Sequence, residues 1–178
     1  MDHSPSPDSP SSPGPDAAVR LEWWCELQCP DCTASLRDLR ALRDAYGERL
    51  EIVLRHFPLE KHQHAFAAAQ AAEEAFAQGK GWEFVEAVLG RTAELGRRGE
   101  KLLLEVAGEL GMDAEELDTA LIDGRHILAV DADHAEGKAI GVKGTPSYVV
   151  GSTLLDGSKD QSGLRERIAG LLDGRLAG

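Results

Sequence analysis

Apolar and polar residues alternate in two short stretches near the start of the chain. Residues 17–24 and 50–56 place apolar side chains at alternate positions or in short runs, which predicts two β-strands. Between them, leucines recur at helical spacing and predict a helix over residues 30–46 that Gly47 ends. A strand–helix–strand unit of this length predicts parallel strands joined by a right-handed crossover.

In the middle of the chain the spacing of apolar residues becomes that of helices. Apolar residues recur every three or four positions through about residues 62–140, and glycines interrupt the pattern. Asp113 followed by Glu116 fits the capped start of one helix. The predicted helices cover residues 62–78, 81–95, 101–110, 114–122 and 127–140.

The last part of the chain returns to short strands. Residues 147–150 and 153–155, separated by Gly151-Ser152, predict a β-hairpin, and residues 161–172 predict an amphipathic helix. The expected order is βαβ, a helical insertion, and ββα, which is an α/β fold.

Composition limits the domain organisation and the partners. Residues 1–16 are mostly Pro, Ser, Asp and Gly, so we predict a disordered tail followed by one domain over residues 17–178. The 178 residues carry a formal net charge of −12, which disfavours nucleic acid and anionic membranes, since both bind clustered Lys and Arg. No apolar run approaches the roughly 20 residues of a membrane span, and no signal-peptide pattern opens the sequence. We therefore expect a cytoplasmic protein.

The motif Cys29-Pro30-Asp31-Cys32 opens the first predicted helix. Proline suits the first helical position, so Cys29 falls at the cap and Cys32 lies one turn later on the same face. A helix start favours an anion, so we expect a stabilised Cys29 thiolate as nucleophile and Cys32 as resolving thiol. A CxxC motif beside a βαβ unit is typical of redox sites.

Four separated segments form an ordered set of motifs. They are Cys29-Pro30-Asp31-Cys32; Arg55-His56-Phe57-Pro58-Leu59 with His62 and His64; Gln78-Gly79-Lys80-Gly81-Trp82-Glu83-Phe84; and Gly141-Val142-Lys143-Gly144-Thr145-Pro146. Together they resemble the DsbA-like branch of the thioredoxin superfamily over about residues 19–172. The resemblance implies a thioredoxin-like fold with an all-helical insertion between the βαβ and ββα halves. It also implies a cis-proline site at Thr145-Pro146, whose backbone would bind an extended substrate as an added strand.

Two features depart from the family pattern. Exported oxidants of this family usually carry a histidine next to the second cysteine, whereas this chain has Asp31, whose charge should raise the pKa of Cys29. The approach to the motif is one residue longer than usual, so either Glu22 or Glu26 could fill the acidic position that relays a proton from Cys32. The residues expected to tune the thiols are Pro30, Asp31, Glu26 and Glu22.

Other interpretations of these residues stay open. Cys25, Cys29 and Cys32 have the spacing of an iron-sulfur motif, and with a histidine they could hold zinc. A non-catalytic interaction module gated by cysteine oxidation is a further alternative. Cys25 alone fits a small apolar residue at a strand end or a regulatory third thiol. His62 and His64 precede a helix and fit capping or solvated residues.

The sequence therefore predicts a cytoplasmic thiol-disulfide oxidoreductase. Cys29 is expected to attack a disulfide, Cys32 to resolve the mixed disulfide, and Thr145 and Pro146 to bind the substrate. The expected direction is net reduction. The expected partners are a disulfide-bearing protein or low-molecular-weight thiol substrate and an unidentified electron donor or acceptor. No cofactor and no metal are expected.

Overall fold

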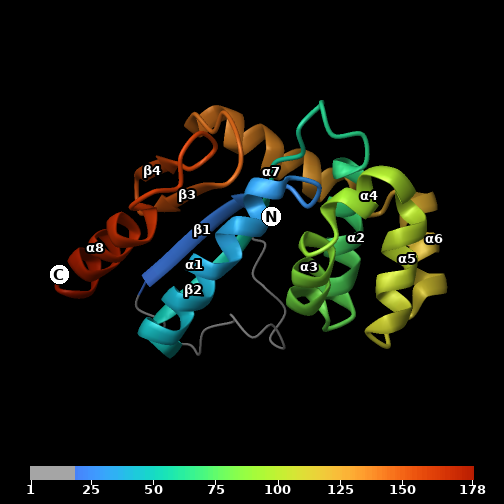
Figure 1. Cartoon of the computed structure of the whole chain (residues 1–178), viewed down its shortest axis with the longest axis horizontal. Helices are drawn as coiled ribbons and strands as arrows, with labels where there is room; N and C mark the ends of the chain where they lie inside the picture. The colour runs from blue at the N-terminus through green and yellow to red at the C-terminus, as the bar shows by residue number, and fades with distance from the viewer. Residues whose placement is uncertain (1–18) are drawn as a thin grey trace.

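The computed structural model describes residues 19–178 (Figure 1). The predicted tail over residues 1–16 lies outside the described residues. The strands are β1 (Val19–Cys25), β2 (Leu50–His56), β3 (Ser147–Val150) and β4 (Thr153–Asp156). The helices are α1 (Pro30–Tyr46), the 3-10 helix η1 (Gly47–Arg49), α2 (Ala65–Ala77), α3 (Gly81–Leu89), α4 (Thr92–Arg98), α5 (Glu100–Glu109), α6 (Ala114–Asp123), α7 (Ile127–Ile140) and α8 (Leu164–Leu176). None of the helices in this part of the chain is long and apolar enough to cross a bilayer.

The strands form a mixed sheet in the order β2-β1-β3-β4. Strands β1 and β2 are parallel, with Cys25 opposite His56. Strand β3 runs antiparallel to β1, with Ser147 opposite Trp24, and β4 pairs with β3 as a hairpin. The predicted order of βαβ, helical insertion and ββα is confirmed.

The structure corrects three of the predicted helices. The helix expected over residues 81–95 is two helices, because the chain leaves helical geometry at Arg91 (φ −133°, ψ 35°). The final helix begins at Leu164 instead of Gln161, since Gly163 precedes it in the left-handed conformation (φ +70°). Helix α2 begins at Ala65, three residues after the predicted start. The expected cap is present, since the Asp113 side chain accepts a hydrogen bond from the Glu116 amide.

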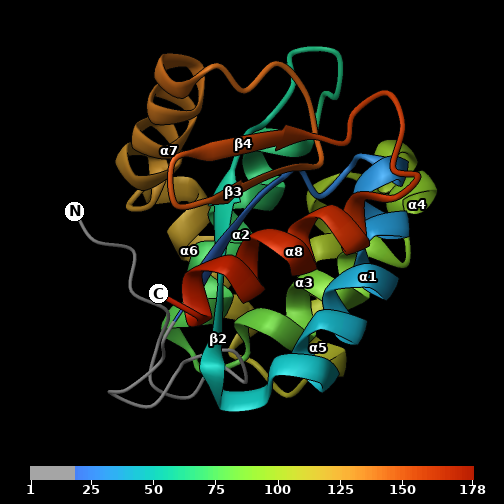
Figure 2. The same ribbon diagram turned by 90° about the vertical axis from the view of Figure 1, so that its left-hand side faces the viewer.

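Helices cover both faces of the sheet (Figure 2). Helices α1 and α8 lie on one face, and the Tyr46 hydroxyl of α1 donates a hydrogen bond to Asp173 of α8, with an O–O distance of 2.6 Å. Helix α7 lies on the other face, over a small apolar cluster formed by Trp24, Phe57 and Val142. Alternate residues of β1 therefore face two different apolar clusters.

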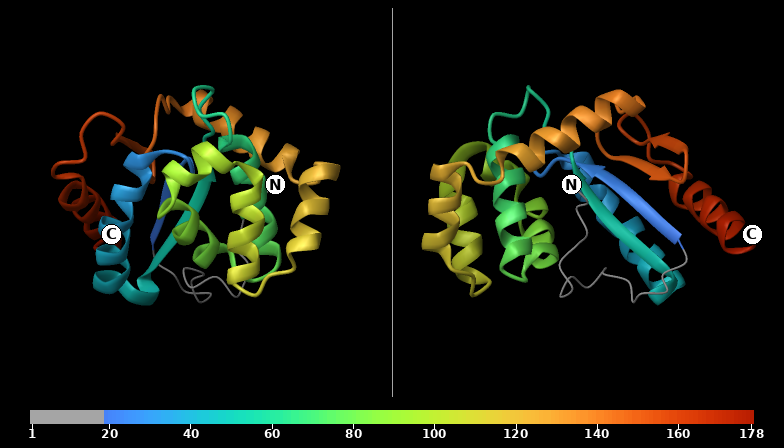
Figure 3. Two further views of the ribbon diagram at one scale, coloured as in Figure 1. Left: turned by 45° about the vertical axis from the view of Figure 1, so that its right-hand side comes forward. Right: turned by 180° about the vertical axis from the view of Figure 1, so that it is seen from behind.

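The insertion shares its core with the sheet. Figure 3 shows α2–α6 gathered beside the strands. Trp82 of α3 stacks on Trp23 of β1, with ring centroids 6.2 Å apart and planes 13° apart. The Arg43 guanidinium of α1 lies 4.5 Å from the centroid of the Trp82 ring. These contacts join the insertion to the βα unit that carries the cysteine motif.

Buried ionic contacts fix α7 and α2 to the end of β2. The Arg55 guanidinium lies 3.2 Å from Asp133 of α7 and also pairs with Glu136. The His56 amide donates to Asp133, with an N–O distance of 3.0 Å. The His56 ring lies 2.7 Å from the carboxylate of Glu73 on α2. Because the charges are paired, this polar network can sit inside the fold.

Gly137 allows α7 to pack closely against the sheet, so a larger residue at this position should destabilise the fold. A Cβ atom at Gly137 would lie 2.7 Å from the Trp24 ring and 2.8 Å from the Phe57 ring. We expect Gly137→Ala to lower the free energy of unfolding by about 1–3 kcal/mol, as overpacked core substitutions do. Urea denaturation measures the change.

Gly108 supplies a matched control on α5, because nothing lies within 4 Å of a Cβ atom added there. Gly108→Ala should raise stability by about 0.5–1 kcal/mol, since alanine is the better helix former. Equal effects of the two substitutions would contradict the close approach of α7.

Candidate functional site

One edge of the sheet collects the segments of the candidate site. Strands β1 and β2 end there at Cys25 and His56, and β3 begins there at Ser147. The Phe57 amide donates to the Cys25 carbonyl oxygen, with an N–O distance of 3.0 Å, so the chains leave the two parallel strands together. The cysteine motif, the loop after β2 and the Thr145-Pro146 segment therefore meet, although they are far apart in sequence.

The cysteine motif has the predicted local geometry. Cys29 is the N-cap of α1 in extended conformation (φ −84°, ψ 118°), and Pro30 follows in the first turn. The Cys32 amide donates to the Cys29 carbonyl oxygen, with an N–O distance of 3.1 Å. Cys29 is 4% exposed and lines a pocket, whereas Cys32 is fully buried behind it. Both side chains are free thiols.

Burial and mutual contact hold both thiols in their protonated form. The Cys29 thiol donates a hydrogen bond to the Cys32 sulfur, and this bond together with burial raises the pKa of Cys29 above its ordinary value. Burial likewise raises the pKa of Cys32. The expected stabilisation of a Cys29 thiolate by the helix start is outweighed in this geometry by the contact with Cys32 and by burial. The predicted rise in pKa is present, but its largest causes are Cys32 and burial and not the charge of Asp31.

The third cysteine lies behind the first two. Cys25 is 1% exposed at the end of β1, and its thiol is hydrogen-bonded to the Cys32 thiol. Burial raises the pKa of Cys25, as expected of a small apolar residue at a strand end. Within residues 19–178, no group of three or more His, Cys, Asp and Glu side chains is placed to hold a metal ion.

The structure brings Glu26, and not Glu22, to the thiols. The Glu26 amide donates to the Cys32 sulfur, with an N–S distance of 3.5 Å. Its carboxylate is buried and accepts a hydrogen bond from the Gln28 amide. Burial raises the pKa of Glu26 to about 7. Glu22 lies near Arg55 on the face of β1 that carries Trp24, opposite the face that carries Cys25, because side chains of a strand alternate between its faces.

His62 is the site residue that the sequence analysis assigned to a different role. Its ring is hydrogen-bonded to the buried Glu26 carboxylate, so the expected capping or solvated position is wrong for His62. His64 contributes its amide, which donates to the Gln28 side chain with an N–O distance of 2.8 Å. The available signal was the position of both histidines soon after β2, at the sheet edge that receives the cysteine motif.

Thr145 and Pro146 complete the site beside Cys29. The Thr145–Pro146 peptide bond is cis, and the Cys29 thiol contacts the Thr145 carbonyl oxygen, with an S–O distance of 3.8 Å. Thr145 is 2% exposed, and its hydroxyl has no hydrogen-bond partner among the described residues. Gly144 lets the segment before Pro146 pack against the loop after β4, since a Cβ atom there would lie 2.7 Å from Ser158.

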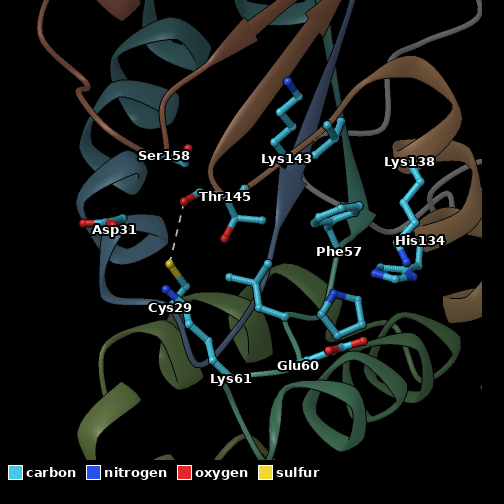
Figure 4. A pocket seen from close by; sticks show the side chains of 14 residues that line it. Cys29, Asp31, Phe57, Glu60, Lys61, His134, Lys138, Lys143, Thr145 and Ser158 are labelled. Atoms are coloured by element: carbon cyan, nitrogen blue, oxygen red, sulfur yellow. Dashed lines mark hydrogen bonds between the residues drawn. The ribbon is translucent and has the colours of Figure 1, made fainter.

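A pocket of about 650 Å³ opens beside Cys29 (Figure 4). It extends from the cysteine motif across the loop after β2 to α7 and the segment before β3. The lining residues are Cys29, Asp31, Phe57, Pro58, Leu59, Glu60, Lys61, His134, Lys138, Val142, Lys143, Gly144, Thr145 and Ser158. The nucleophile candidate and the cis peptide therefore face one common space, which can receive a substrate disulfide.

Comparisons with known proteins agree with this geometry. A family model described as a DSBA-like thioredoxin domain matches residues 20–169. The sodium/proton antiporter NhaA of Herminiimonas arsenicoxydans is 33% identical over 145 residues, which cover 82% of this chain and 22% of that protein. The chain thus spans less than a quarter of the length of this curated relative.

Solved structures share the fold. A thioredoxin-like oxidoreductase from Silicibacter pomeroyi DSS-3 is 27% identical, with a TM-score of 0.74 and 92% of each chain covered. BdbD from Bacillus subtilis in its oxidised form is 19% identical, with a TM-score of 0.78 and 96% of each chain covered. At this identity the similarity shows a shared fold only. The expected thioredoxin-like fold is confirmed.

The raised pKa of Glu26 predicts a pH-dependent contribution to stability. A carboxyl group with a higher pKa in the folded state than in the unfolded state stabilises at low pH, and this contribution is lost as pH rises through about 7. Glu26→Gln should remove the dependence. We expect the variant to gain on the order of 3 kcal/mol relative to the native chain between about pH 5 and pH 8.

Urea denaturation at several pH values measures this gain. The matched control is Glu83→Gln, since Glu83 is exposed on α3. The free energy of unfolding of this control should change with pH in the same way as that of the native chain. A parallel curve for Glu26→Gln would show that Glu26 does not titrate as its burial requires.

Proposed function

Because the chain belongs to the family of DSBA-like thioredoxin domains, which are thiol-disulfide oxidoreductases, we propose that Cys29 and Cys32 are its redox-active pair. The Cys29 thiol loses its proton to water in the pocket, and its thiolate attacks one sulfur of a substrate disulfide. The other substrate sulfur leaves as a thiolate, which takes up a proton. The Cys32 thiolate then attacks the Cys29 sulfur of the mixed disulfide. The second substrate thiol is released, and the protein is left with a Cys29–Cys32 disulfide.

The main support for this proposal is that a substrate in the pocket can reach one of the two thiols and not the other. Cys29 lines the pocket at the cap of α1, whereas Cys32 is fully buried and hydrogen-bonded to Cys29. A substrate in the pocket can therefore reach Cys29 and not Cys32. After the first step, Cys32 is the thiol next to the mixed disulfide, as a resolving residue must be.

Glu26 is suited to accept the proton of Cys32. A general base works best when its pKa lies near the working pH, and burial raises the pKa of Glu26 to about 7. Its backbone amide already contacts the Cys32 sulfur. His62 is hydrogen-bonded to the Glu26 carboxylate and orients it. We assign His62 as a positioning residue of this proton acceptor.

Thr145 and Pro146 are suited to hold the substrate chain beside Cys29. The Thr145 carbonyl oxygen contacts the Cys29 thiol, so an extended substrate paired with this backbone would place its disulfide at the nucleophile. The unpartnered Thr145 hydroxyl gives the same substrate a further hydrogen-bonding group. Thr145 itself lines the pocket beside Cys29.

The protonated thiols favour a reductase. Strong oxidants of this chemistry stabilise their reduced form through a thiolate of low pKa, and here contact with Cys32 and burial raise the pKa of Cys29. We propose net reduction of protein or low-molecular-weight disulfides in the cytoplasm, where thiols are kept reduced. A separate thiol donor must then restore the dithiol.

Serine substitutions separate the roles of the two cysteines. Cys29→Ser should lower turnover of a disulfide substrate to the uncatalysed rate, because no accessible nucleophile remains. Cys32→Ser should accumulate a mixed disulfide with the substrate, visible as an added mass on the intact protein. Cys25→Ala is the matched control and should keep turnover within about threefold, since this residue takes no part in either step. Full turnover by Cys29→Ser would overturn the assignment.

The reduction potential tests the proposed direction. Equilibration against graded thiol buffers, followed by trapping of free thiols, should give a value near about −270 mV for the Cys29–Cys32 pair. A value near about −120 mV would make the protein an oxidant and contradict the proposed reductase. A redox-gated interaction module would show a reversible transition but no turnover.

A further inference from the structure

The pocket at Cys29 has a cationic rim in an acidic chain. Lys61, Lys138 and Lys143 line it, which is three of the six lysines of a chain whose formal net charge is −12. They come from the loop after β2, from α7 and from the segment before β3, so the fold and not the sequence brings them together. In Figure 4 Lys61 extends toward Cys29, Lys138 lies beside His134 on the other side of the pocket, and Lys143 points away from Cys29.

The three ammonium groups are available to a ligand. All three lysines are exposed, and within residues 19–178 none of them forms an ion pair with a carboxylate. Arg91 and Arg125, in contrast, are paired with glutamate or aspartate. The pocket lining therefore carries three ammonium groups against two carboxylates, which belong to Asp31 and Glu60.

Beneath this rim the pocket is apolar. Phe57 and Val142 are 5% and 4% exposed and pack against Trp24. The His134 ring of α7 lies 4.7 Å from the Phe57 ring, measured between centroids. Next to Cys29, the buried Thr145 hydroxyl has no partner among the described residues. The pocket thus combines an apolar floor with three lysines in its lining, and we call it the lysine groove.

We propose that the lysine groove selects disulfide substrates whose residues next to the reactive cysteine carry carboxylates. This inference rests on the proposed function. The lysines of the groove attract the substrate and exchange neither protons nor electrons with it. The new bond joins Cys29 to one substrate sulfur, and the other substrate sulfur leaves as a thiolate. Unpaired cations in a concave site favour a bound anion and its arrival.

Two kinds of substrate would carry carboxylates close to the reactive sulfur. An acidic segment of a protein would lie along the Thr145 backbone with its carboxylates at the rim. A small acidic thiol such as glutathione would carry its own carboxylates to the same lysines. A basic substrate, in contrast, would meet three ammonium groups beside the nucleophile. The shared requirement is a carboxylate within reach of Cys29, and the experiment separates the two sources.

The experiment uses the Cys32→Ser protein and symmetrical disulfides of three short peptides. The peptides share one cysteine and differ only in having Glu, Gln or Lys on either side of it. The rate of mixed-disulfide formation is followed by intact mass. We expect the Glu peptide to react about tenfold faster than the Lys peptide, with the Gln peptide between them. The difference should shrink at about 0.5 M salt, because exposed charges are then screened.

Two charge-matched variants locate the effect. The triple variant Lys61→Gln/Lys138→Gln/Lys143→Gln should remove the preference for the Glu peptide. The control variant Lys80→Gln/Arg97→Gln/Lys101→Gln loses the same charge from exposed positions of the insertion and should keep the preference. An equal loss of the preference in both variants would assign the effect to net charge, and a preference kept by both would show that these lysines are not its source. Either result would overturn the role of the groove.

The outcomes separate this inference from the function on which it rests. If no peptide modifies Cys29, the proposed function fails. If all three peptides react at equal rates, the function stands and the selectivity is wrong. Oxidised glutathione is tested beside the Glu peptide: faster reaction of glutathione indicates a small-thiol substrate, and faster reaction of the peptide indicates an acidic protein segment.

Discussion

The parallel pairing of β1 and β2 is the constraint on which the site depends. Because Cys25 lies opposite His56, both strands end at one edge of the sheet, and the segments that leave them start from the same place. The cysteine motif comes after β1, and the loop with His62 comes after β2. Antiparallel β3 begins at this edge after the cis Thr145–Pro146 bond. A shift of this register by one residue would exchange the two faces of β1, so that Trp23 and Trp24 would each meet the wrong apolar cluster.

Burial decides the chemistry that this geometry supports. The helix start alone favours a thiolate at Cys29, yet contact with Cys32 and the loss of water have the larger effect and raise its pKa. The same loss of water raises the pKa of Glu26 to about 7. A carboxyl group that protonates near neutral pH and two protonated thiols thus occupy one poorly hydrated region. The Glu26 amide contacts the Cys32 sulfur and the Glu26 carboxylate contacts His62, so one residue joins the thiols to the loop after β2.

The sequence was sufficient for the parts of the structure that depend on local patterns. The bounds of α1 and β2 follow from leucine spacing, from Pro30 and from the alternation of apolar residues, and the structure agrees with them. The partner of Cys32 could not be predicted, because the choice between Glu22 and Glu26 depends on where β1 ends and which face each side chain takes. The contact of His62 with Glu26 and the gathering of the three groove lysines depend on long-range packing.

Helix α7 has one face that packs against the sheet and another that is exposed at the pocket, and each face tolerates different residues. Gly137 faces the sheet, where the Trp24 and Phe57 rings leave no room for a side chain. Lys138, the next residue, is exposed at the pocket rim. Substitutions at the rim can therefore accumulate without disturbing the core, while the inward position tolerates almost none. The charge of the pocket lining is thus independent of the shape of the contact between α7 and the sheet.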